Sequence, residues 1–463
     1  MTSLAVARSS LVTSLTRYSR SWGLWLLLLV ALVGTRFWVP RDDGTTIIIA
    51  VGNQIPVMTS AMIGVSLGIV VSTLLLPVGY VYLRSNTTRR QPWQIEEVTA
   101  GSRVAIALGR FGADVAMLFT VLGALTLAGW FLAWRIVPAD ELDLGEVALA
   151  LWLVAAPAVM GLAAIRILFD AVPMLRRALG DFFYFIIWVA SIAAPASMAD
   201  RPPSFAANMA DFAGFVRPMI FGAPDGDHGF QIGGGPVEPG RIPLDVMSGL
   251  LSPGYIDSRL AWAAIAVALA AVAGLVYRPH RLPKRSKGSS RLSRWLNPGA
   301  PPAADATAPA AACSRSPALG LIAAEFRLIG KGRVFWLLAT GIALLGALVD
   351  FRHGASPAML LLLTFGLTAH AGRAEARGMG PLASTAPLPP LARRLAFVIA
   401  GTLWSLLLAL PAIVAAASVE RLELALATGA AASLIAAALA ALSGSAFAPR
   451  VVLLIAWYVY MSA

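Results

Sequence analysis

Long apolar runs that are nearly free of charge recur along the chain and alternate with polar segments. A helix needs about 20 apolar residues to cross the hydrocarbon core of a bilayer, so such runs predict membrane helices. The pattern therefore predicts an all-α, polytopic transmembrane helical bundle of about 11 spans. The predicted spans lie near residues 22–40, 57–83, 115–134, 147–165, 182–199, 260–277, 334–349, 354–372, 395–419, 424–449 and 451–463.

Composition leaves no soluble domain large enough to work alone. Of 463 residues, 58% are apolar and 13% are charged, whereas a soluble domain carries about 25% charged residues. The single cysteine, Cys313, excludes a disulfide framework or a multi-cysteine metal centre within the chain. The first run is expected to be a retained span rather than a signal peptide. Arg36 lies near its end, and no small-residue cleavage site precedes a soluble domain.

The distribution of charge predicts the orientation. If the N-terminus is cytoplasmic and every run crosses once, 27 of the 36 Lys and Arg residues lie in cytoplasmic segments. The 24 acidic residues divide the other way, with 8 inside and 16 outside. Because Lys and Arg concentrate on the cytoplasmic side of membrane proteins, we expect a cytoplasmic N-terminus. The net charge of +12 is thus attributed to topology rather than to nucleic-acid binding.

With these boundaries, every charged residue falls in a loop or at the end of a span. Ion-coupled carriers and proton pumps usually hold ionisable groups in the middle of the membrane. The absence of such groups counts against ion coupling, although backbone carbonyls can also bind sodium.

The chain divides into two similar halves joined by a linker. Residues 1–277 are expected to hold six spans, and residues 318–463 about five. The linker, 278–317, begins with seven basic residues and continues as an Ala/Pro-rich connector. We interpret its basic run as a solvated topogenic segment, with binding of lipid headgroups or a partner as the alternative. Each half opens with an amphipathic basic segment, Leu15–Ser21 and Ala324–Arg333.

Three stretches of the chain carry a resemblance to a known family. They are QPWQIEEVTA at 91–100 with LGRFGAD at 108–114, AEFRLIGKGR at 324–333, and GMGPLASTAP at 378–387 with Arg393 and Arg394. In these stretches and in the order of its spans, the chain resembles the permease subunits of ATP-binding-cassette (ABC) exporters of the type-2 class. The second stretch is similar to the elbow helix that precedes a half. The other two are similar to the connection between the second and third spans.

The resemblance implies a partner. In that family the permease forms the pathway and cassette subunits hydrolyse ATP. This chain contains no GxxxxGK[ST] phosphate loop, so we expect a separate ATPase subunit, as a dimer, with ATP and Mg²⁺ on that partner. No cofactor, metal or nucleic acid is expected on this chain. By position, the resemblance assigns the ATPase-coupling contact to Gln94, Ile95, Glu96, Glu97, Glu375, Leu382 and Ser384. The alternative for each of these residues is an interfacial helix stabilised by lipid.

The segment 200–258 is the one long extracytoplasmic segment. Phe205, Met209, Phe212, Val216 and Met219 recur with the spacing of one helix face. Because the family often has short external helices that close the exit of the pathway, these residues are expected to form an external lid helix. A helix that only rests in the interface is the alternative.

Two further features of the sequence are considered. Asp225, Asp227 and His228 could bind a metal, but a Gly-rich turn accounts for them better, since no Glu completes a calcium loop. Only thirteen residues follow Arg450, about 20 Å of helix against a core of about 30 Å. The last span is therefore expected to be incomplete, because the reading frame is truncated or because the second half departs from the family pattern.

Together these observations predict a multi-pass permease subunit of an ATP-driven exporter in a plasma membrane, namely a bacterial inner membrane. It would bind membrane lipid and would not itself be an enzyme. The alternatives are an ion-coupled secondary transporter, a membrane enzyme using segment 200–258, and a membrane anchor for a cytoplasmic assembly.

Overall fold

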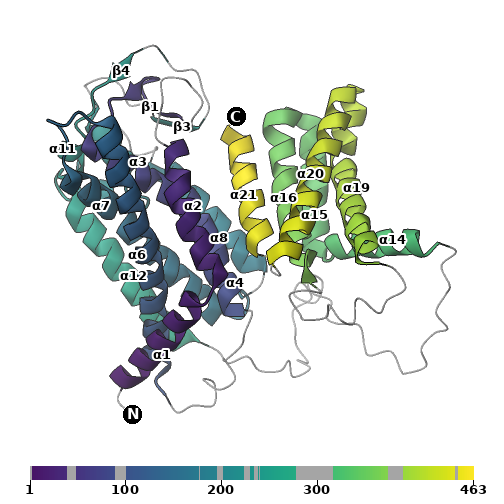
Figure 1. The fold of residues 1–463 in the computed structure, drawn as a ribbon, viewed down its shortest axis with the longest axis horizontal. Coiled ribbons are helices and arrows are strands. Elements are labelled where there is room, and N and C mark those ends of the chain that lie inside the picture. The colour runs from purple at the N-terminus through teal and green to yellow at the C-terminus, as the bar shows by residue number, and fades with distance from the viewer. Residues whose placement is uncertain are drawn as a thin grey trace. The chain divides into compact units, whose positions relative to one another are not determined.

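The computed structural model is built almost entirely of helices (Figure 1). About 81% of the residues that it describes are helical, which confirms the all-α prediction. Contacts between Cα atoms divide the chain into two compact units, with the boundary at Arg281. The described residues are 3–38, 48–88, 101–176, 178–195, 202–223, 230–233, 238, 240–277, 316–373, 389–443 and 447–462.

Unit 1 contains a short first helix and a bundle of long apolar helices. The described helices of the bundle and its approach are α1 (Ser3–Ser19), α2 (Trp22–Trp38), α3 (Ser60–Val70), η1 (Val71–Leu75), α4 (Leu76–Thr88), α6 (Arg103–Ile136), α7 (Leu144–Ala171), α8 (Ala178–Ala193) and α12 (Tyr255–Val276). The helices α3, η1 and α4 form one apolar span, Ser60–Arg84. In an 18-residue apolar stretch of this span, 89% of the residues are buried. This span packs against α7 and α6 and is the central helix of the unit.

Small residues allow the helices of unit 1 to approach closely. A Cβ atom on Gly68 of α3 would lie 2.6 Å from Val154 Cγ1 of α7, and one on Gly129 of α6 would lie 2.6 Å from Leu67 Cδ1. Such glycines at helix crossings are typical of membrane bundles, where association depends on van der Waals contact rather than on expulsion of water.

The segments between the helices of unit 1 collect at opposite ends of the bundle (Figure 1). At one end, β1 (Ile48–Val51) pairs antiparallel with β3 (Phe230–Gly233), and β2 (Ile55–Pro56) pairs parallel with β4 (Arg241–Ile242). Ser60 Oγ accepts a hydrogen bond from the Asp143 N–H at 3.0 Å, which ties the α6–α7 connection to this same end. The helix α1 lies at the other end, where Ser10 Oγ donates to Ile106 O at 3.1 Å.

Unit 2 begins with an amphipathic helix that turns sharply into the bundle. Its described helices are α14 (Pro317–Ile329), α15 (Arg333–Leu348), η3 (Phe351–Ala355), α16 (Ser356–His370), α19 (Pro390–Ala416), α20 (Val419–Ser443) and α21 (Phe447–Ser462). The axes of α14 and α15 differ by 88°. The turn requires glycine, because Gly332 has a φ of +113°, where a Cβ atom is strained.

Trp404 of α19 is the packing centre of unit 2. Its fully buried ring stacks on Phe326 at 4.5 Å and meets the edges of Phe335 and Trp336. Its Nε1 donates to Phe326 O at 2.8 Å, so both polar and apolar contacts hold α14 against α19. Gly330, at the end of α14, lies directly on the indole, and a Cβ atom there would overlap the ring.

The outer faces of the long helices carry stripes of exposed apolar side chains. On α19 such residues recur every three or four positions along the whole helix, namely Leu391, Leu395, Ile399, Leu403, Leu407, Leu410 and Val414. Exposure of such a surface to water is unfavourable, whereas lipid tails can cover it. A multi-pass membrane architecture follows from these faces and from the length of the helices.

The number of spans is supported only in part. Each of the eleven predicted runs overlaps a described helix. Among the described residues, six helices are long and apolar enough to cross a bilayer, or seven if α14 and α15 form one bent span. The helices α2, α8, α15, α16 and α21 have 17, 16, 16, 15 and 16 residues, below the length of about 20 residues that a straight span needs. Eleven complete spans therefore stay a prediction.

The contact between Gly330 and Trp404 makes a packing prediction. We expect Gly330→Ala to force the buried indole aside and to lower the stability of unit 2 by about 1–3 kcal/mol, the usual cost of overpacking. The matched control is Gly341→Ala in α15, where a Cβ atom meets nothing within 4 Å. Thermal unfolding of the purified chain in detergent, followed by tryptophan fluorescence, measures both. Equal melting temperatures for the two variants would contradict the packing described here.

Candidate functional site

A cluster of buried charged side chains, Asp114, Arg166 and Asp170, lies at the α1 end of unit 1. It is formed where the N-terminal part of α6, the C-terminal parts of α7 and α12, and the helix α1 meet. The helix α6 has 34 residues, about 51 Å at 1.5 Å per residue, whereas the hydrocarbon core is about 30 Å thick. Its length lets charged side chains lie on a continuous helix and still be beyond the apolar part of the span.

A chain of polar contacts joins three helices at this end. The Tyr18 hydroxyl of α1 donates to Asp114 Oδ1 of α6 at 2.5 Å. The second carboxylate oxygen, Asp114 Oδ2, accepts from Arg166 NH1 of α7 at 3.0 Å. Arg166 Nε also lies 3.3 Å from Asp170 Oδ2, one turn further along α7. Tyr18, Asp114 and Arg166 are each at most 2% exposed.

Burial gives these contacts their importance. An isolated charge buried away from water is strongly unfavourable, whereas a paired and hydrogen-bonded one is tolerated. Asp114 compensates Arg166 and is itself satisfied by Tyr18, so each group depends on the other two. Burial, and then the adjacent Asp114 carboxylate, raise the pKa of Tyr18 well above its usual value. Tyr18 therefore stays a neutral hydrogen-bond donor.

A second ion pair fixes the neighbouring helices. Arg84 Nε of α4 lies 2.7 Å from Asp181 Oδ1 of α8, and Arg84 NH2 donates to Leu175 O at 3.0 Å. The rings of Tyr80 and Tyr184 stack at 3.7 Å beside this pair. The ends of α4 and α8 are therefore fixed relative to each other, as α1, α6 and α7 are by Asp114.

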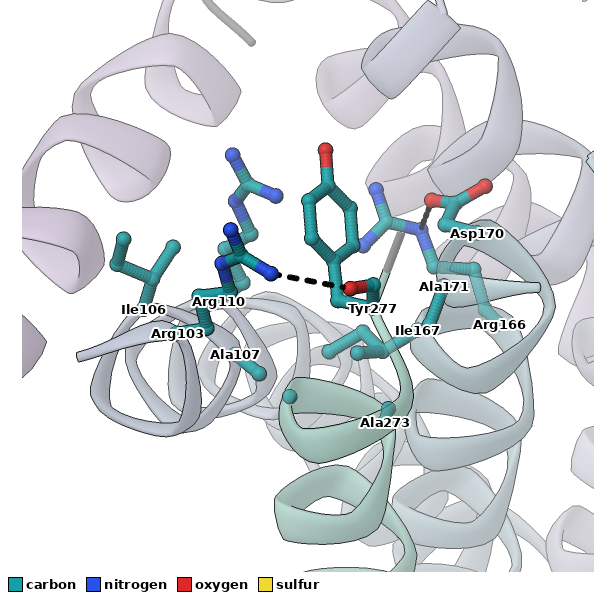
Figure 2. Close-up of a pocket in the computed structure, with 11 residues that line it drawn as sticks. Arg103, Ile106, Ala107, Arg110, Arg166, Ile167, Asp170, Ala171, Ala273 and Tyr277 are labelled. Atoms are coloured by element: carbon teal, nitrogen blue, oxygen red, sulfur yellow. Dashed lines mark hydrogen bonds and ion pairs between the residues drawn. The ribbon is translucent and has the colours of Figure 1, made fainter. Parts of the chain in front are cut away.

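A small pocket, with a cavity volume of about 40 Å³, opens beside the buried chain of contacts (Figure 2). Figure 2 shows the ring of Tyr277 between the guanidinium groups of Arg103 and Arg110 on one side and of Arg166 on the other. Arg103 NH1 donates to Tyr277 O at 3.4 Å, which ties the start of α6 to the end of α12. Asp170 is the one acidic residue among those that line this pocket.

The small side chains of the pocket wall leave room for a ligand. Ala107 of α6, Ala171 of α7, and Ala273 and Gly274 of α12 line it together with the arginines. Gly274 lies against the backbone of α6, where a Cβ atom would come within 2.6 Å of Val104 Cα. The wall is therefore formed by helices in close contact, with charged groups projecting from it.

The predicted external lid residues are distributed over two short helices. Phe205 and Met209 belong to α9 (Phe205–Met209), while Val216 and Met219 belong to α10 (Val216–Phe221), and Phe212 lies between them. The apolar spacing predicts one helix with a single face, whereas the structure has two short helices. Val216 and Met219 are buried, whereas Phe205 is 48% exposed.

A buried carboxylate explains the break between α9 and α10. Asp211 accepts hydrogen bonds from the N–H groups of Gly214 at 2.8 Å and Arg217 at 2.9 Å, which closes a turn in place of a helix. Gly214 has a φ of +85°, which a helix cannot contain. Burial raises the pKa of Asp211, while Arg259 and these backbone groups act in the opposite direction.

The segment that holds α9 and α10 is bonded to the bundle rather than loosely attached. Arg259 of α12 donates to Asn208 O at 3.0 Å and to Phe212 O at 3.3 Å. The ring of Phe212 packs on Gly161 of α7 and meets the edge of Trp262 at 5.0 Å. The helices α10 and α11 (Val246–Leu250) belong to one continuous apolar core with α3 and α7.

Other sequence predictions lie outside the described residues. This applies to all the proposed ATPase-coupling residues, Gln94, Ile95, Glu96, Glu97, Glu375, Leu382 and Ser384, and to Asp225, Asp227 and His228. Within the described residues, no group of three His, Cys, Asp or Glu side chains could hold a metal ion.

The charged pocket is not among the sequence predictions. Arg110 and Asp114 belong to the family-like stretch 108–114, and Arg166 and Asp170 follow the predicted span 147–165, where a loop was expected. A signal was present in the sequence. Asp114 directly precedes one predicted span and Arg166 directly follows the next, so both lie at the same end of two neighbouring spans. Comparisons of this chain with protein-family models, curated proteins and solved structures give no match.

The shared carboxylate of Asp114 makes a stability prediction. We expect Asp114→Asn to destabilise unit 1 by about 3 kcal/mol, because Arg166 loses a buried countercharge. Tyr18→Phe should cost about 1.5–3 kcal/mol through the loss of a hydrogen bond to a charged group. Asp140→Asn, at an exposed side chain in the α6–α7 connection, is the matched control. Denaturant unfolding in detergent measures all three, and a neutral Asp114→Asn would refute the role assigned to this group.

Proposed function

We propose that this chain is the membrane-spanning permease subunit of an ATP-driven exporter of the ABC type-2 class. In this proposal a separate ATPase subunit, present as a dimer, binds ATP and Mg²⁺ and hydrolyses the nucleotide. The chain would lie in a plasma membrane, a bacterial inner membrane, with its N-terminus in the cytoplasm. Rigid-body movement of the two units would alternately open the pathway to each side.

The observation that carries this proposal is a packing scheme that occurs in both units. The helix α1 packs on α6 as α14 packs on α19, and α2 packs on α6 as α15 packs on α19. The pair α6–α7 corresponds to α19–α20, and the contact of α3 with α7 corresponds to that of α16 with α20. Transporters are often built from such structural repeats. An even number of spans in the first half would give both repeats the same orientation.

The entry helices of the two units support the same proposal. Each unit starts with a helix that precedes the first apolar helix and is held by a buried contact to a long helix. Tyr18 holds α1 to α6, and Trp404 holds α14 to α19. In unit 2, Glu325 of α14 also pairs with Arg373 NH2 at 3.1 Å, beyond the end of α16. These are the contacts that an elbow helix needs in order to follow movement of the bundle.

The segregation of segments in unit 1 supports the proposed topology. The segments predicted to be external, near residues 48–56, 138–143 and 202–254, gather at one end, and α1 lies at the other. The arginine-rich pocket is at the α1 end. With the positive-inside rule, this arrangement favours a cytoplasmic location for that end.

An ion-coupled secondary transporter is the second candidate. The observation that favours it is the buried carboxylate of Asp114 on a candidate span, since intramembrane carboxylates often bind protons or ions. The position of Asp114 near one end of α6 and its bonds to Arg166 and Tyr18 favour a structural role instead. Flux driven by an ion gradient in vesicles without ATP would support this second candidate.

The first test of the proposal is recovery of the ATPase partner. A tagged chain is extracted from its native membrane in mild detergent, and the proteins that co-purify are identified by mass spectrometry. We expect a nucleotide-binding cassette subunit in stoichiometric amount. Replacement of Gln94–Glu97 by alanine should abolish its recovery, while alanine at Asp140 and Glu141, in the α6–α7 connection, should not. If the chain purifies alone and binds none of the candidate ATPases of its source, the proposal fails.

The second test addresses orientation. Cys313→Ser gives a chain without cysteine, into which Ser9→Cys or Ala139→Cys is introduced at exposed positions. A membrane-impermeant maleimide should label the cysteine at 139 in intact cells and the one at 9 only after permeabilisation. The reverse pattern would overturn the proposed topology.

A further inference from the structure

The pocket beside Tyr277 gathers more positive charge than its own carboxylate can neutralise. Arg103, Arg110 and Arg166 line it together with Asp170, and Asp114 beside the pocket also pairs with Arg166. Three arginines against these two carboxylates still leave an excess of positive charge around one cavity, where like charges repel each other. Arg176 adds a fourth guanidinium, 5.3 Å from the centre of the Tyr277 ring. Several guanidinium groups facing one cavity raise the energy of the empty site and favour an anion there.

We propose that this pocket binds a phosphate group, as carried by the headgroup of an anionic phospholipid. Guanidinium groups form paired, charge-assisted hydrogen bonds with phosphate oxygens, and several arginines around one space give the donors that a phosphate needs. Asp114 is not available to neutralise the other arginines of the pocket, because its two oxygens already accept hydrogen bonds from Tyr18 and Arg166.

The position of the pocket favours a lipid headgroup over a fully dissolved anion. It lies at the end of α12, whose last turn carries Leu275 and Val276, 74% and 45% exposed. Acyl chains could cover these side chains while the headgroup enters between α6 and α12. Basic pockets between membrane helices are a known means of holding anionic lipids at the cytoplasmic surface. This inference does not depend on an ATPase partner and can fail or succeed independently of the proposed function.

The test is binding of phosphatidylglycerol to the full chain, measured by native mass spectrometry in detergent, with phosphatidylcholine as the reference lipid. We expect one phosphatidylglycerol to be retained preferentially. The double variant Arg103→Gln/Arg110→Gln should bind it about tenfold more weakly or worse, because two positive charges are lost near the surface. Arg110→Lys keeps the charge but loses the planar donor pair, and it should give an intermediate loss.

The matched control is Arg135→Gln/Arg241→Gln, which removes the same charge at exposed side chains away from the pocket. This control should bind phosphatidylglycerol like the unmodified chain. Equal weakening by both double variants, or equal retention of the two lipids, would overturn the proposal. If the pocket double variant does not fold, Arg103→Gln alone provides the comparison, since Arg103 is exposed.

A competition experiment separates the two sources of phosphate. Glycerol 3-phosphate at millimolar concentration is added to the chain with bound phosphatidylglycerol. Displacement that requires Arg103 and Arg110 would support a site that recognises the phosphate itself. Retention of the lipid would support a site that also needs the acyl chains, with the lipid headgroup as the natural occupant.

Discussion

The ion pair between Asp114 and Arg166 determines how the α1 end of unit 1 is assembled. Both side chains are buried, so neither could be placed there without the other. Because they belong to α6 and α7, the pair fixes the relative position of two long helices. Tyr18 adds α1 to the same carboxylate. Three helices are thus held by one acidic group.

In unit 2, the entry helix is anchored chiefly by an aromatic cluster. This helix, α14, is held by stacking of Phe326 on Trp404 and by the hydrogen bond from the indole N–H to Phe326 O. An aromatic side chain with one polar atom suits this position, because it fills a large volume and satisfies a carbonyl at the end of a helix. The packing scheme recurs between the units while the chemistry at the contact differs. A repeat of this kind is recognised in the arrangement of helices, not in residue identity.

The sequence predicted helices well because the signal is local. Apolar runs of sufficient length identify them, and the run 57–83 corresponds closely to the span Ser60–Arg84. The hydropathy pattern underestimated the length of α6, which was predicted at 115–134 and extends over Arg103–Ile136. Charged residues such as Arg103 and Asp114 resemble a loop in a hydropathy pattern. Asp114 is compatible with a buried position only because of its partners on other helices, Tyr18 and Arg166, which are far away in the sequence.

The segment 200–258, which is predicted to be external, shows the same limitation. Its apolar spacing predicted one helix, but Asp211 and Gly214 divide it, and a glycine in such a run is a visible local signal. The pairing of β1 with β3 had no local signal, because the two strands come from distant parts of the chain. The candidate pocket likewise depends on three separate helices. For the proposed coupling residues, the sequence pattern and the family resemblance are the only grounds.

The arginines of the pocket bear on two proposals, the topology of the chain and the binding of an anionic ligand. Positive charge at the cytoplasmic ends of spans fixes topology during insertion, and this requires only that the charge be on the correct side. Placing Arg103, Arg110 and Arg166 around one open space requires more, because Asp114 and Asp170 offset only part of the positive charge there and like charges in a confined site repel each other. Topology alone would be satisfied equally well by dispersed arginines such as Arg8 and Arg20. The convergence of guanidinium groups is therefore better explained by an anionic ligand that occupies the space and removes the repulsion.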